Sequence, residues 1–345
     1  MGLFGSNEIT GIDVGVGSIK VVRIKPGKRP KLIAASLIEF PPLASNEPVS
    51  GEPVSSDIKQ LVSEKKIGRT NVITQMPGKD LTIRSLTLPK IPLAELREAI
   101  RWEAKRHVSY SLDDALVEYL ITGEKHEGAV DKYDVVMVAA EKSRIMEHLT
   151  PLNAAGIKVT AVDANALALR NILFRGVGVP EEEVVVVDIG AGNMEINIFK
   201  NGVLRFSRCL ETGGIDMTRL VADHLRVNIN EAESVKRSVH VRGLPGDDAT
   251  AAVIISRIDA LLMEIRRSIE YYKATFREKG VVRAILAGGT FLMSDLPEYF
   301  SESLGLPVEC CDPFVALDCS DALKEEFGPQ ALRFATAVGL ALRKA

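Results

Sequence analysis

A glycine-rich motif occurs twice in this chain of 345 residues, and the two copies lie about half a chain apart. The copies are Gly11–Val22 and Val187–Ile198. Both begin with an apolar segment, continue with Asp-x-Gly-x-Gly and a polar residue, and end with a second apolar segment. Because a repeat at half the chain length is typical of duplicated domains, the sequence predicts two related α/β domains that face each other.

Each copy of the motif predicts a β-hairpin whose turn is formed by the glycines. The expected strands are Ile9–Asp13 and Ile19–Ile24 in the first copy, and Val184–Asp188 and Glu195–Phe199 in the second. The first copy has too little preceding chain for a helix and lacks the third glycine of a dinucleotide fingerprint. Binding of NAD or FAD is therefore disfavoured.

Glycine turns of this kind can bind phosphate, because backbone N–H groups come close to a ligand where no Cβ intervenes. Two turns from facing domains would hold one polyphosphate from both sides. The motif aspartates, Asp13 and Asp188, can hold Mg²⁺ directly or through water, and Lys20 can offset phosphate charge. An ordinary hairpin turn is the alternative, but a third glycine pair after a strand, Gly288-Gly289, favours nucleotide binding.

Hydrophobic periodicity elsewhere predicts alternating helices and strands. The expected helices are Ser56–Lys66, Leu93–Val108, Lys142–Ala155, Ala164–Phe174, Gly214–Leu225, Asn230–Val239, Ala251–Lys279 and Gln330–Leu342. The further expected strands are Asn71–Gln75, Leu81–Leu86, Ala115–Thr122, Tyr133–Ala140, Lys158–Val162 and Val281–Ala287, with a charged hairpin loop at Glu124–Lys132.

Composition narrows the classes of partner. The 43 basic residues nearly balance 46 acidic ones, so the chain lacks the positive excess of a nucleic-acid-binding protein. Its apolar runs are shorter than the roughly 20 residues that span a bilayer. The first residues also lack the basic segment with which a signal peptide begins. We expect a cytoplasmic protein without a transmembrane segment. Met1–Ser6 matches the spacing of a myristoylation signal, but a glycine-rich start is the favoured explanation, because such a short pattern recurs by chance.

The order of the glycine motifs resembles the actin, Hsp70 and sugar-kinase superfamily. Asp13-x-Gly15-x-Gly17-x-x-Lys20, Asp188-x-Gly190-x-Gly192 and Ala287–Thr290 correspond to its phosphate-1, phosphate-2 and adenosine motifs. The resemblance implies an actin-like ATPase fold of two ribonuclease-H-like domains, with ATP or ADP and Mg²⁺ between them. The cofactor-binding residues it implies are Asp13, Gly15, Gly17, Ser18, Lys20, Gly190, Ala191, Gly192, Asn193, Gly213, Gly214, Glu233, Lys236, Gly288, Gly289 and Thr290, with Asp13 and Asp188 on the metal.

Glu233 and Lys236 belong to that set because their E-x-x-K spacing matches the residues that contact the ribose and base in the superfamily. The alternative for these two residues is an exposed pair on one helix face, since side chains three positions apart are neighbours there.

Within the superfamily, segment 72–169 is most similar to the PilM family of actin-like proteins of type IV pilus assembly. The resemblance rests on Met76-Pro77-Gly78, on Ala99-Ile100-x-Trp102-Glu103-Ala104 and on Val162-Asp163. It implies a small inserted subdomain of the type shared with FtsA at residues 89–155. Residues 1–88 and 156–175, completed by 330–345, would form the first domain, and residues 176–329 the second.

PilM-like proteins bind the short cytoplasmic N-terminal segment of the inner-membrane protein PilN. The resemblance therefore implies a cytoplasmic scaffold that is held at the inner membrane by its partners, with other pilus-machine components and self-association as further expectations. We expect the peptide in a groove between the first half and residues 89–155, with Arg84 as a contact. The alternative for Arg84 is packing against nearby helix acids such as Glu95 or Glu98.

Enzyme activity is expected to be at most slow ATP hydrolysis. Asn193 stands where active members of the superfamily usually carry threonine, and Asn165 stands where the PilM pattern often has a carboxylate. A small-molecule or sugar kinase is the alternative, and Asp163 is the candidate for the general base that such a kinase needs. An FtsA-like filament-forming protein is a third interpretation. It is disfavoured because FtsA usually carries a C-terminal amphipathic membrane helix, whereas the given sequence ends with Arg343-Lys344-Ala345 directly after the last expected helix.

Overall fold

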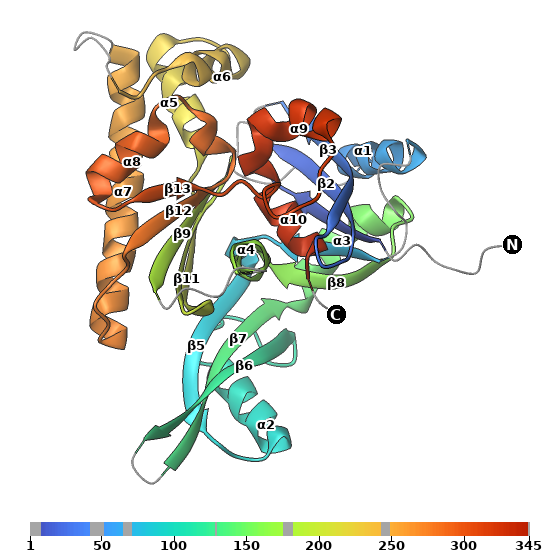
Figure 1. Ribbon diagram of the computed structural model, residues 1–345, viewed down its shortest axis with the longest axis vertical. Helices are drawn as coiled ribbons and strands as arrows, with labels where there is room; N and C mark the ends of the chain where they lie inside the picture. The colour runs from blue at the N-terminus through green and yellow to red at the C-terminus, as the bar shows by residue number, and fades with distance from the viewer. Residues whose placement is uncertain are drawn as a thin grey trace, which may run out of the picture.

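A computed structural model describes residues 8–41, 52–64, 71–127, 130–174, 182–242 and 249–343. Within these residues the strands form three sheets, and Figure 1 shows two lobes side by side with the third sheet extending from them. The Met1–Ser6 pattern lies outside the described residues.

The first lobe is built on a sheet with the strand order β3-β2-β1-β4-β8. Its strands are β1 (Ile9–Val14), β2 (Ser18–Lys25), β3 (Lys31–Glu39), β4 (Val72–Met76) and β8 (Val159–Ala164). The first three strands form antiparallel hairpins, whereas β4 runs parallel to β1 and β8 runs parallel to β4.

The second lobe repeats this arrangement in the order β11-β10-β9-β12-β13. Its strands are β9 (Glu183–Ile189), β10 (Met194–Lys200), β11 (Val203–Leu210), β12 (Arg283–Ala287) and β13 (Val308–Cys310). As in the first lobe, the first three are antiparallel and the last two add in parallel. The duplication predicted from the two glycine motifs is therefore confirmed as a duplication of sheet topology.

Helices cover the sheets of both lobes. The first lobe has α1 (Glu52–Ser63), α3 (Lys142–Ala154), α4 (Asn165–Leu173), α9 (Asp321–Phe327) and α10 (Ala335–Ala341), and the second has α5 (Gly214–Leu225), α6 (Ile229–Ser238), α7 (Ala249–Phe276) and α8 (Leu296–Leu304). One apolar face of α7 is buried in the second lobe, with Ile258, Leu261, Leu262 and Ile265 at most 2% exposed. Helix α1 begins four residues earlier than predicted, because Pro53 fits the first turn of a helix.

One hydrophobic cluster joins the two lobes. It contains Val22 and Leu32 of the first sheet, Val186 and Phe199 of the second, and Val338 of α10. The predicted single helix Gln330–Leu342 is wrong, because the chain forms a 3₁₀ segment, η3 (Gly328–Phe334), before α10, with non-helical dihedral angles at Gln330.

Two glycines allow α10 to pack closely in the first lobe. A Cβ at Gly339 would overlap the carbonyl of Ala168 in α4, and a Cβ at Gly11 of β1 would overlap the carbonyl of Ala337. Because side chains are absent at these two points, α10 lies directly on α4 and β1.

The third sheet, which we call the insert, has the order β5-β7-β6 and is covered by α2 (Leu93–Ala104). Its strands are β5 (Leu81–Pro89), β6 (Ala115–Glu127) and β7 (Val130–Glu141). The predicted loop Glu124–Lys132 is wrong, because the two strands continue to Glu127 and resume at Val130. Strand β5 pairs with β7 within this sheet, whereas α3, which follows β7, packs on α1 of the first lobe. The predicted domain boundaries, with residues 89–155 as the inserted subdomain, stay a prediction.

Candidate functional site

The two glycine turns meet in a cleft between the lobes. This cleft has a volume of about 340 Å³ and is lined by both turns, by the chain after β12 and by α6. The turns are in contact, because a Cβ placed on Gly17 would lie 2.9 Å from the Cβ of Ala191. In the part of the chain that the structure describes, the N–H groups of Val16, Gly17, Ala191 and Gly192 donate no hydrogen bond.

In the first lobe, Asp13 is held in place from two sides. Lys20 lies opposite it in the β1–β2 register, and its Nζ is 2.9 Å from Asp13 Oδ2. Gln75, near the end of the parallel strand β4, donates from Nε2 to Asp13 Oδ1 at 2.9 Å. These contacts orient a charged carboxylate toward the cleft.

In the second lobe, Asp188 has the equivalent position at the end of β9. Asn165 donates from Nδ2 to Asp188 Oδ2 at 2.7 Å, and Thr336 donates to Asn165 Oδ1 at 2.7 Å. Burial raises the pKa of Asp188, and the negative charge of Asp13 raises it further. Two carboxylates from different lobes therefore lie near enough to repel each other.

A third carboxylate, Glu195, lies beside Asp188. The two residues are paired across β9 and β10, and Glu195 is only 3% exposed. Burial, together with the neighbouring charge of Asp188, raises the pKa of Glu195 to about 8. Among the described residues its Oε1 has no hydrogen-bond partner, and a Cβ on Gly78 would overlap this atom. Glu195 is therefore a neutral, tightly enclosed acid at neutral pH.

The glycine pair after β12 forms a further wall of the cleft, beside Asp188. Gly288 has φ +94° and lies against the backbone of Ile189, where a Cβ would overlap the carbonyl oxygen. Thr290 donates from Oγ1 to the carbonyl of Gly190 at 3.1 Å. These contacts attach the Gly288–Thr290 segment to the second glycine turn, so the two predicted motifs form one continuous wall.

In this wall, Lys236 of α6 is buried and Glu233 is half-buried. Lys236 is 8% exposed, and its Nζ donates to Glu233 Oε2 at 2.6 Å, to Thr218 Oγ1 at 2.9 Å and to the carbonyl of Gly214 at 3.2 Å. Burial acts to raise the pKa of Glu233, but Lys236 and the hydrogen bonds outweigh it and lower this pKa to about 2. An exposed helix pair is excluded.

An ion-pair bridge joins the lobes at the edge of the cleft. Glu39, the last residue of β3, accepts from Arg237 of α6 at 3.2 Å and from Arg333 of η3 at 2.8 Å. Burial acts to raise the pKa of Glu39, but the two arginines outweigh it and lower the pKa. All three residues line the cleft.

Most residues predicted for the cofactor line this cleft. They are Asp13, Gly15, Gly17, Ser18, Lys20, Asp188, Gly190, Ala191, Asn193, Gly214, Glu233, Lys236, Gly288, Gly289 and Thr290. Gly192 and Gly213 are not among the lining residues. Gly213 packs against the backbone of the second glycine turn, because a Cβ at this position would lie 2.6 Å from the carbonyl oxygen of Ala191.

Asp163 and Arg84 lie elsewhere, so the structure corrects their predicted surroundings. Asp163 is the second-last residue of the outer strand β8 and does not line the cleft; Arg343 Nε lies 3.0 Å from its Oδ2. It lines a different groove and has no access to the cleft as a general base. Arg84 does not line that groove either, and instead faces a hollow between β5 and β11.

Several cleft residues were not predicted: Glu39, Gln75, Arg237, Arg333 and Thr336. Gln75 could have been found, because parallel strands place the residues at their carboxyl ends along one edge of a sheet. Glu39, Arg237 and Arg333 come from three distant segments without a shared motif, so no local signal indicates them.

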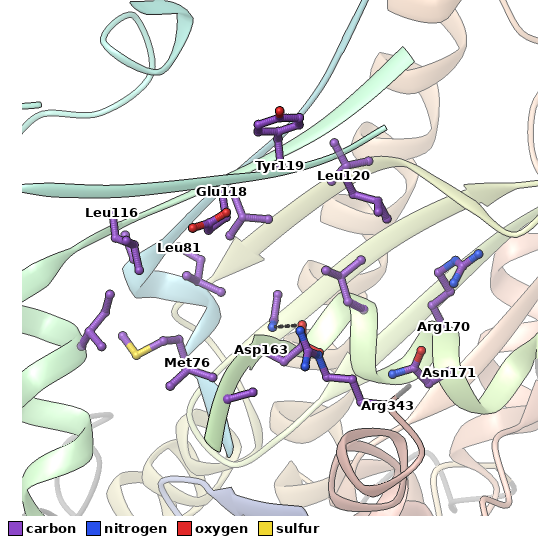
Figure 2. A pocket seen from close by; sticks show the side chains of 18 of the residues that line it. Met76, Leu81, Leu116, Glu118, Tyr119, Leu120, Asp163, Arg170, Asn171 and Arg343 are labelled. Carbon is purple, nitrogen blue, oxygen red and sulfur yellow. Dashed lines mark hydrogen bonds and ion pairs between the residues drawn. The ribbon is translucent and has the colours of Figure 1, made fainter. Parts of the chain in front are cut away.

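A groove separates the insert from the first lobe and has a volume of about 960 Å³. Figure 2 shows Leu116, Glu118 and Leu120 of β6 on the side that faces the groove, while Tyr119 points away. Leu116 and Leu120 are 46% and 49% exposed. Among the described residues, β6 pairs only with β7 and β8 only with β4, so two free sheet edges border an apolar groove.

Metal binding by protein side chains alone is not supported. Within the described ranges, no group of three or more histidine, cysteine or acidic side chains could hold an ion. A cation between Asp13 and Asp188 would therefore take its other ligands from water or phosphate, as Mg²⁺ commonly does.

Comparison with known proteins identifies the family. A family model described as type IV pilus assembly protein PilM matches residues 11–345. This chain belongs to the PilM family of type IV pilus assembly proteins. A chain from a PilM–PilN type IV pilus biogenesis complex has a TM-score of 0.85 and 24% identity, covering 98% of this chain and 99% of that one. The actin-like fold predicted for this PilM-family member is confirmed.

More distant similarities agree with this fold. EutJ of Carboxydothermus hydrogenoformans has a TM-score of 0.59 and 16% identity, covering 99% of this chain and 91% of that one. Cell division protein FtsA of Neisseria meningitidis serogroup B is 29% identical over 178 residues, or 46% of this chain and 41% of FtsA. FtsA of Bacillus subtilis is 28% identical over 107 residues, or 30% of this chain and 23% of FtsA. The chain thus spans less than half the length of these curated relatives.

Among the helices of the described part of the chain, none is long and apolar enough to cross a membrane.

Proposed function

We propose that this PilM-family protein is a nucleotide-binding scaffold of type IV pilus assembly, which docks the cytoplasmic N-terminal segment of a PilN-like inner-membrane protein. The observation that carries the proposal is the groove between β6 and β8, an apolar channel bordered by two free strand edges. The solved relative was determined as a PilM–PilN complex, which supports a PilN-like partner here.

The groove suits an extended peptide. A peptide can add to an exposed sheet edge through main-chain hydrogen bonds, while pockets receive alternate side chains. Leu116 and Leu120 of β6 offer apolar contacts on one wall, and Val159 and Ala161 of β8 offer them on the other. Asp163 and Arg343 supply an ion pair beside this apolar surface, as Figure 2 shows. Such a protein would be cytoplasmic and held at the inner membrane through its partner.

The cleft suits ATP or ADP with Mg²⁺. Free N–H groups in both glycine turns can donate to phosphate oxygens, and Lys20 supplies positive charge. Asp13 and Asp188 would hold a hydrated Mg²⁺, whose charge would relieve the repulsion between them. Thr290, Glu233 and Lys236 would lie beside the adenosine.

Hydrolysis is proposed to be slow. The residue beside Asp188 is the amide Asn165, which cannot accept a proton from an attacking water, and Glu195 is already neutral at neutral pH. The protein would then use the nucleotide to fix the relation of the two lobes rather than for rapid turnover.

Peptide docking is tested with a fluorescent peptide from the N-terminus of a PilN-like protein encoded in the same organism. We expect Leu120→Asp to weaken binding at least about tenfold, because it places a charge in the apolar groove. Leu93→Asp is the matched control, since Leu93 is 59% exposed on α2 and does not line the groove. Equal binding by wild type and Leu120→Asp would refute the docking site.

Nucleotide binding is tested by calorimetry with ADP and Mg²⁺. Asp188→Ala should weaken binding by roughly tenfold, because it removes a metal-side carboxylate. Asp223→Ala, which removes an exposed carboxylate of α5 outside the cleft, should leave it unchanged. Absence of heat from the wild type at millimolar Mg²⁺ would contradict the nucleotide part while leaving the docking part intact.

A further inference from the structure

A second large hollow lies between the insert and the second lobe, on the other side of the insert from the groove of Leu120. Its walls are β5 from Leu81 to Leu86, β11 from Leu204 to Leu210, and α7 from Arg267 to Phe276, and its volume is about 1080 Å³. We call it the interlobe hollow.

Two free strand edges border this hollow as well. In the sheet orders of the described residues, β5 ends the insert and β11 ends the second lobe. No β-pairing joins them, although the two strands approach each other. A strand edge presents unpaired N–H and C=O groups, which are a template for an added strand.

The floor and one wall of the hollow are apolar and aromatic. Leu204 is 2% exposed at the base. Phe206 of β11 and Tyr271 of α7 form a ring pair with centroids 5.7 Å apart, and Tyr271 is 58% exposed. An exposed tyrosine beside a strand edge provides a contact surface for an apolar side chain at low entropic cost.

The hollow carries an excess of positive charge. The cations that line it are Lys79, Arg84, Arg205, Arg208 and Arg267. Three carboxylates of the described chain pair with them: Glu211 with Lys79, Asp134 with Arg205, and Glu264 with both Arg208 and Arg267. Glu195 also lines the hollow. Even with Glu195 counted, five cations face four acids, in a chain whose overall charge is −3.

Arg84 is the centre of this excess. It is exposed on β5, and its guanidinium donates only to the carbonyl of Ile83 at 3.2 Å and to His107 Nδ1 at 3.5 Å among the described residues. A guanidinium without a carboxylate partner is suited to bidentate binding of one from a ligand.

We propose that the interlobe hollow binds an acidic, extended segment of a partner protein, which adds to a free strand edge and places a carboxylate on Arg84. The occupant alternates apolar and acidic residues, because successive side chains of a strand point to opposite faces. Apolar side chains then pack against Phe206 and Tyr271, and acidic ones meet the arginines. This site is separate from the proposed PilN groove and does not depend on it.

The probe for this proposal is a fluorescein-labelled peptide of four Val-Glu repeats, with four Val-Lys repeats as its counterpart. Fluorescence anisotropy on the full chain should show binding of Val-Glu and not of Val-Lys. Arg84→Glu and, independently, Tyr271→Ala should each weaken binding about tenfold or more, which corresponds to loss of one charge-assisted or aromatic contact. A Val-Glu peptide with N-methylated backbone amides should also bind more weakly, because it cannot donate to a strand edge.

Arg97→Glu is the matched control, because Arg97 is an exposed arginine of α2 outside the hollow. Thermal unfolding checks that every variant is folded. If Arg84→Glu does not fold, Tyr271→Ala still tests the proposal. Equal loss with Arg97→Glu would reduce the effect to general charge attraction and overturn the proposal. If the N-methylated peptide binds as tightly as the unmodified one, strand addition is refuted. If Leu120→Asp abolishes binding of the Val-Glu peptide, the peptide binds in the groove of Leu120 and the proposal is refuted.

Discussion

At the scale of single residues, the main feature is a cluster of three carboxylates around the glycine turns. Asp13 is neutralised by Lys20, and Asp188 is hydrogen-bonded by Asn165. Glu195 has neither a cation nor, at Oε1, a hydrogen-bond partner among the described residues. Its burial makes the protonated form the stable one, so this position senses pH.

We predict that Glu195 lowers the stability of the protein as pH rises. Its pKa is about 8 in the folded protein and 4.5 when unperturbed, so the folded state keeps a proton that the unfolded state releases. The contribution of Glu195 to stability is complete below pH 4.5 and is lost progressively up to pH 8. Glu195→Gln should remove this dependence and be more stable at pH 8.5, by at most about 5 kcal/mol.

Urea unfolding without nucleotide or Mg²⁺, at pH 5 and at pH 8.5, measures this difference. Glu98→Gln on the exposed face of α2 is the control, and it should leave the pH dependence of the wild type unchanged. A Glu195→Gln protein that loses stability with pH as steeply as the wild type would contradict the prediction.

The sequence predicted Asp13 and Asp188 because their chemistry is encoded locally, in a turn motif that needs only neighbouring residues. It did not predict their hydrogen bonds to Gln75 and Asn165, because these residues are distant along the chain and meet the aspartates only when parallel strands align. Asp163 was misplaced for the same reason, since the direction of its side chain depends on contact with Arg343.

At the scale of elements, close backbone packing decides where the C-terminal helix lies. Gly339 of α10 faces the carbonyl of Ala168 in α4 without room for a Cβ. Glycine is normally a weak helix residue, about 1 kcal/mol worse than alanine in the interior of a helix. Its presence inside α10 is explained by the contact with α4.

We predict that Gly339→Ala destabilises the protein, against the usual preference of helices for alanine. The overlap with Ala168 requires α10 to move, and overpacking of this kind costs typically 1–3 kcal/mol. Gly328→Ala is the matched control, because Gly328 has helical dihedral angles and open space around its Cα. Chemical denaturation should show a lower free energy of unfolding for Gly339→Ala than for the wild type, and an unchanged one for Gly328→Ala. The reverse order would show that α10 does not pack as described.

Elements with a strong local pattern were predicted well, and elements that depend on their neighbours were not. The hairpins of the two motifs and α5 agree with the prediction, because their glycines and periodic apolar residues specify them. Strands β3 and β11 were missed, since no glycine motif marks them and they form by pairing with β2 and β10. The break at Gln330 lies in a segment that packs on strands of both lobes. Such long-range packing leaves no trace in the spacing of apolar residues along the chain, so the break could not be predicted.

At the scale of the whole molecule, the bridge of Glu39 with Arg237 and Arg333 connects the lobes at the edge of the cleft. We predict that Glu39→Gln speeds the release of a bound nucleotide about two- to fivefold. The change is modest because partly exposed ion pairs contribute about 0.2–1 kcal/mol. Stopped-flow release of fluorescent ADP measures the rate.

Two controls accompany that measurement. Glu302→Gln removes an ion pair with Arg242 within the second lobe and should leave the release rate unchanged. High salt should reduce the difference between wild type and Glu39→Gln, because salt screens partly exposed charges. A difference that persists unchanged in high salt would point to a cause other than the bridge.

The cluster that joins Val22 and Leu32 to Val186, Phe199 and α10 has a consequence for how the molecule comes apart. Because this apolar surface belongs to both lobes at once, neither can melt without exposing the interior of the other. Differential scanning calorimetry should therefore give one heat-absorption peak in place of two, with a calorimetric enthalpy equal to the van't Hoff enthalpy. Two resolved peaks would mean that the lobes are thermodynamically independent. If a single peak is observed, the shared hydrophobic cluster stays intact while the protein is folded. A rearrangement of the cleft would then be a rotation of the two lobes about this cluster.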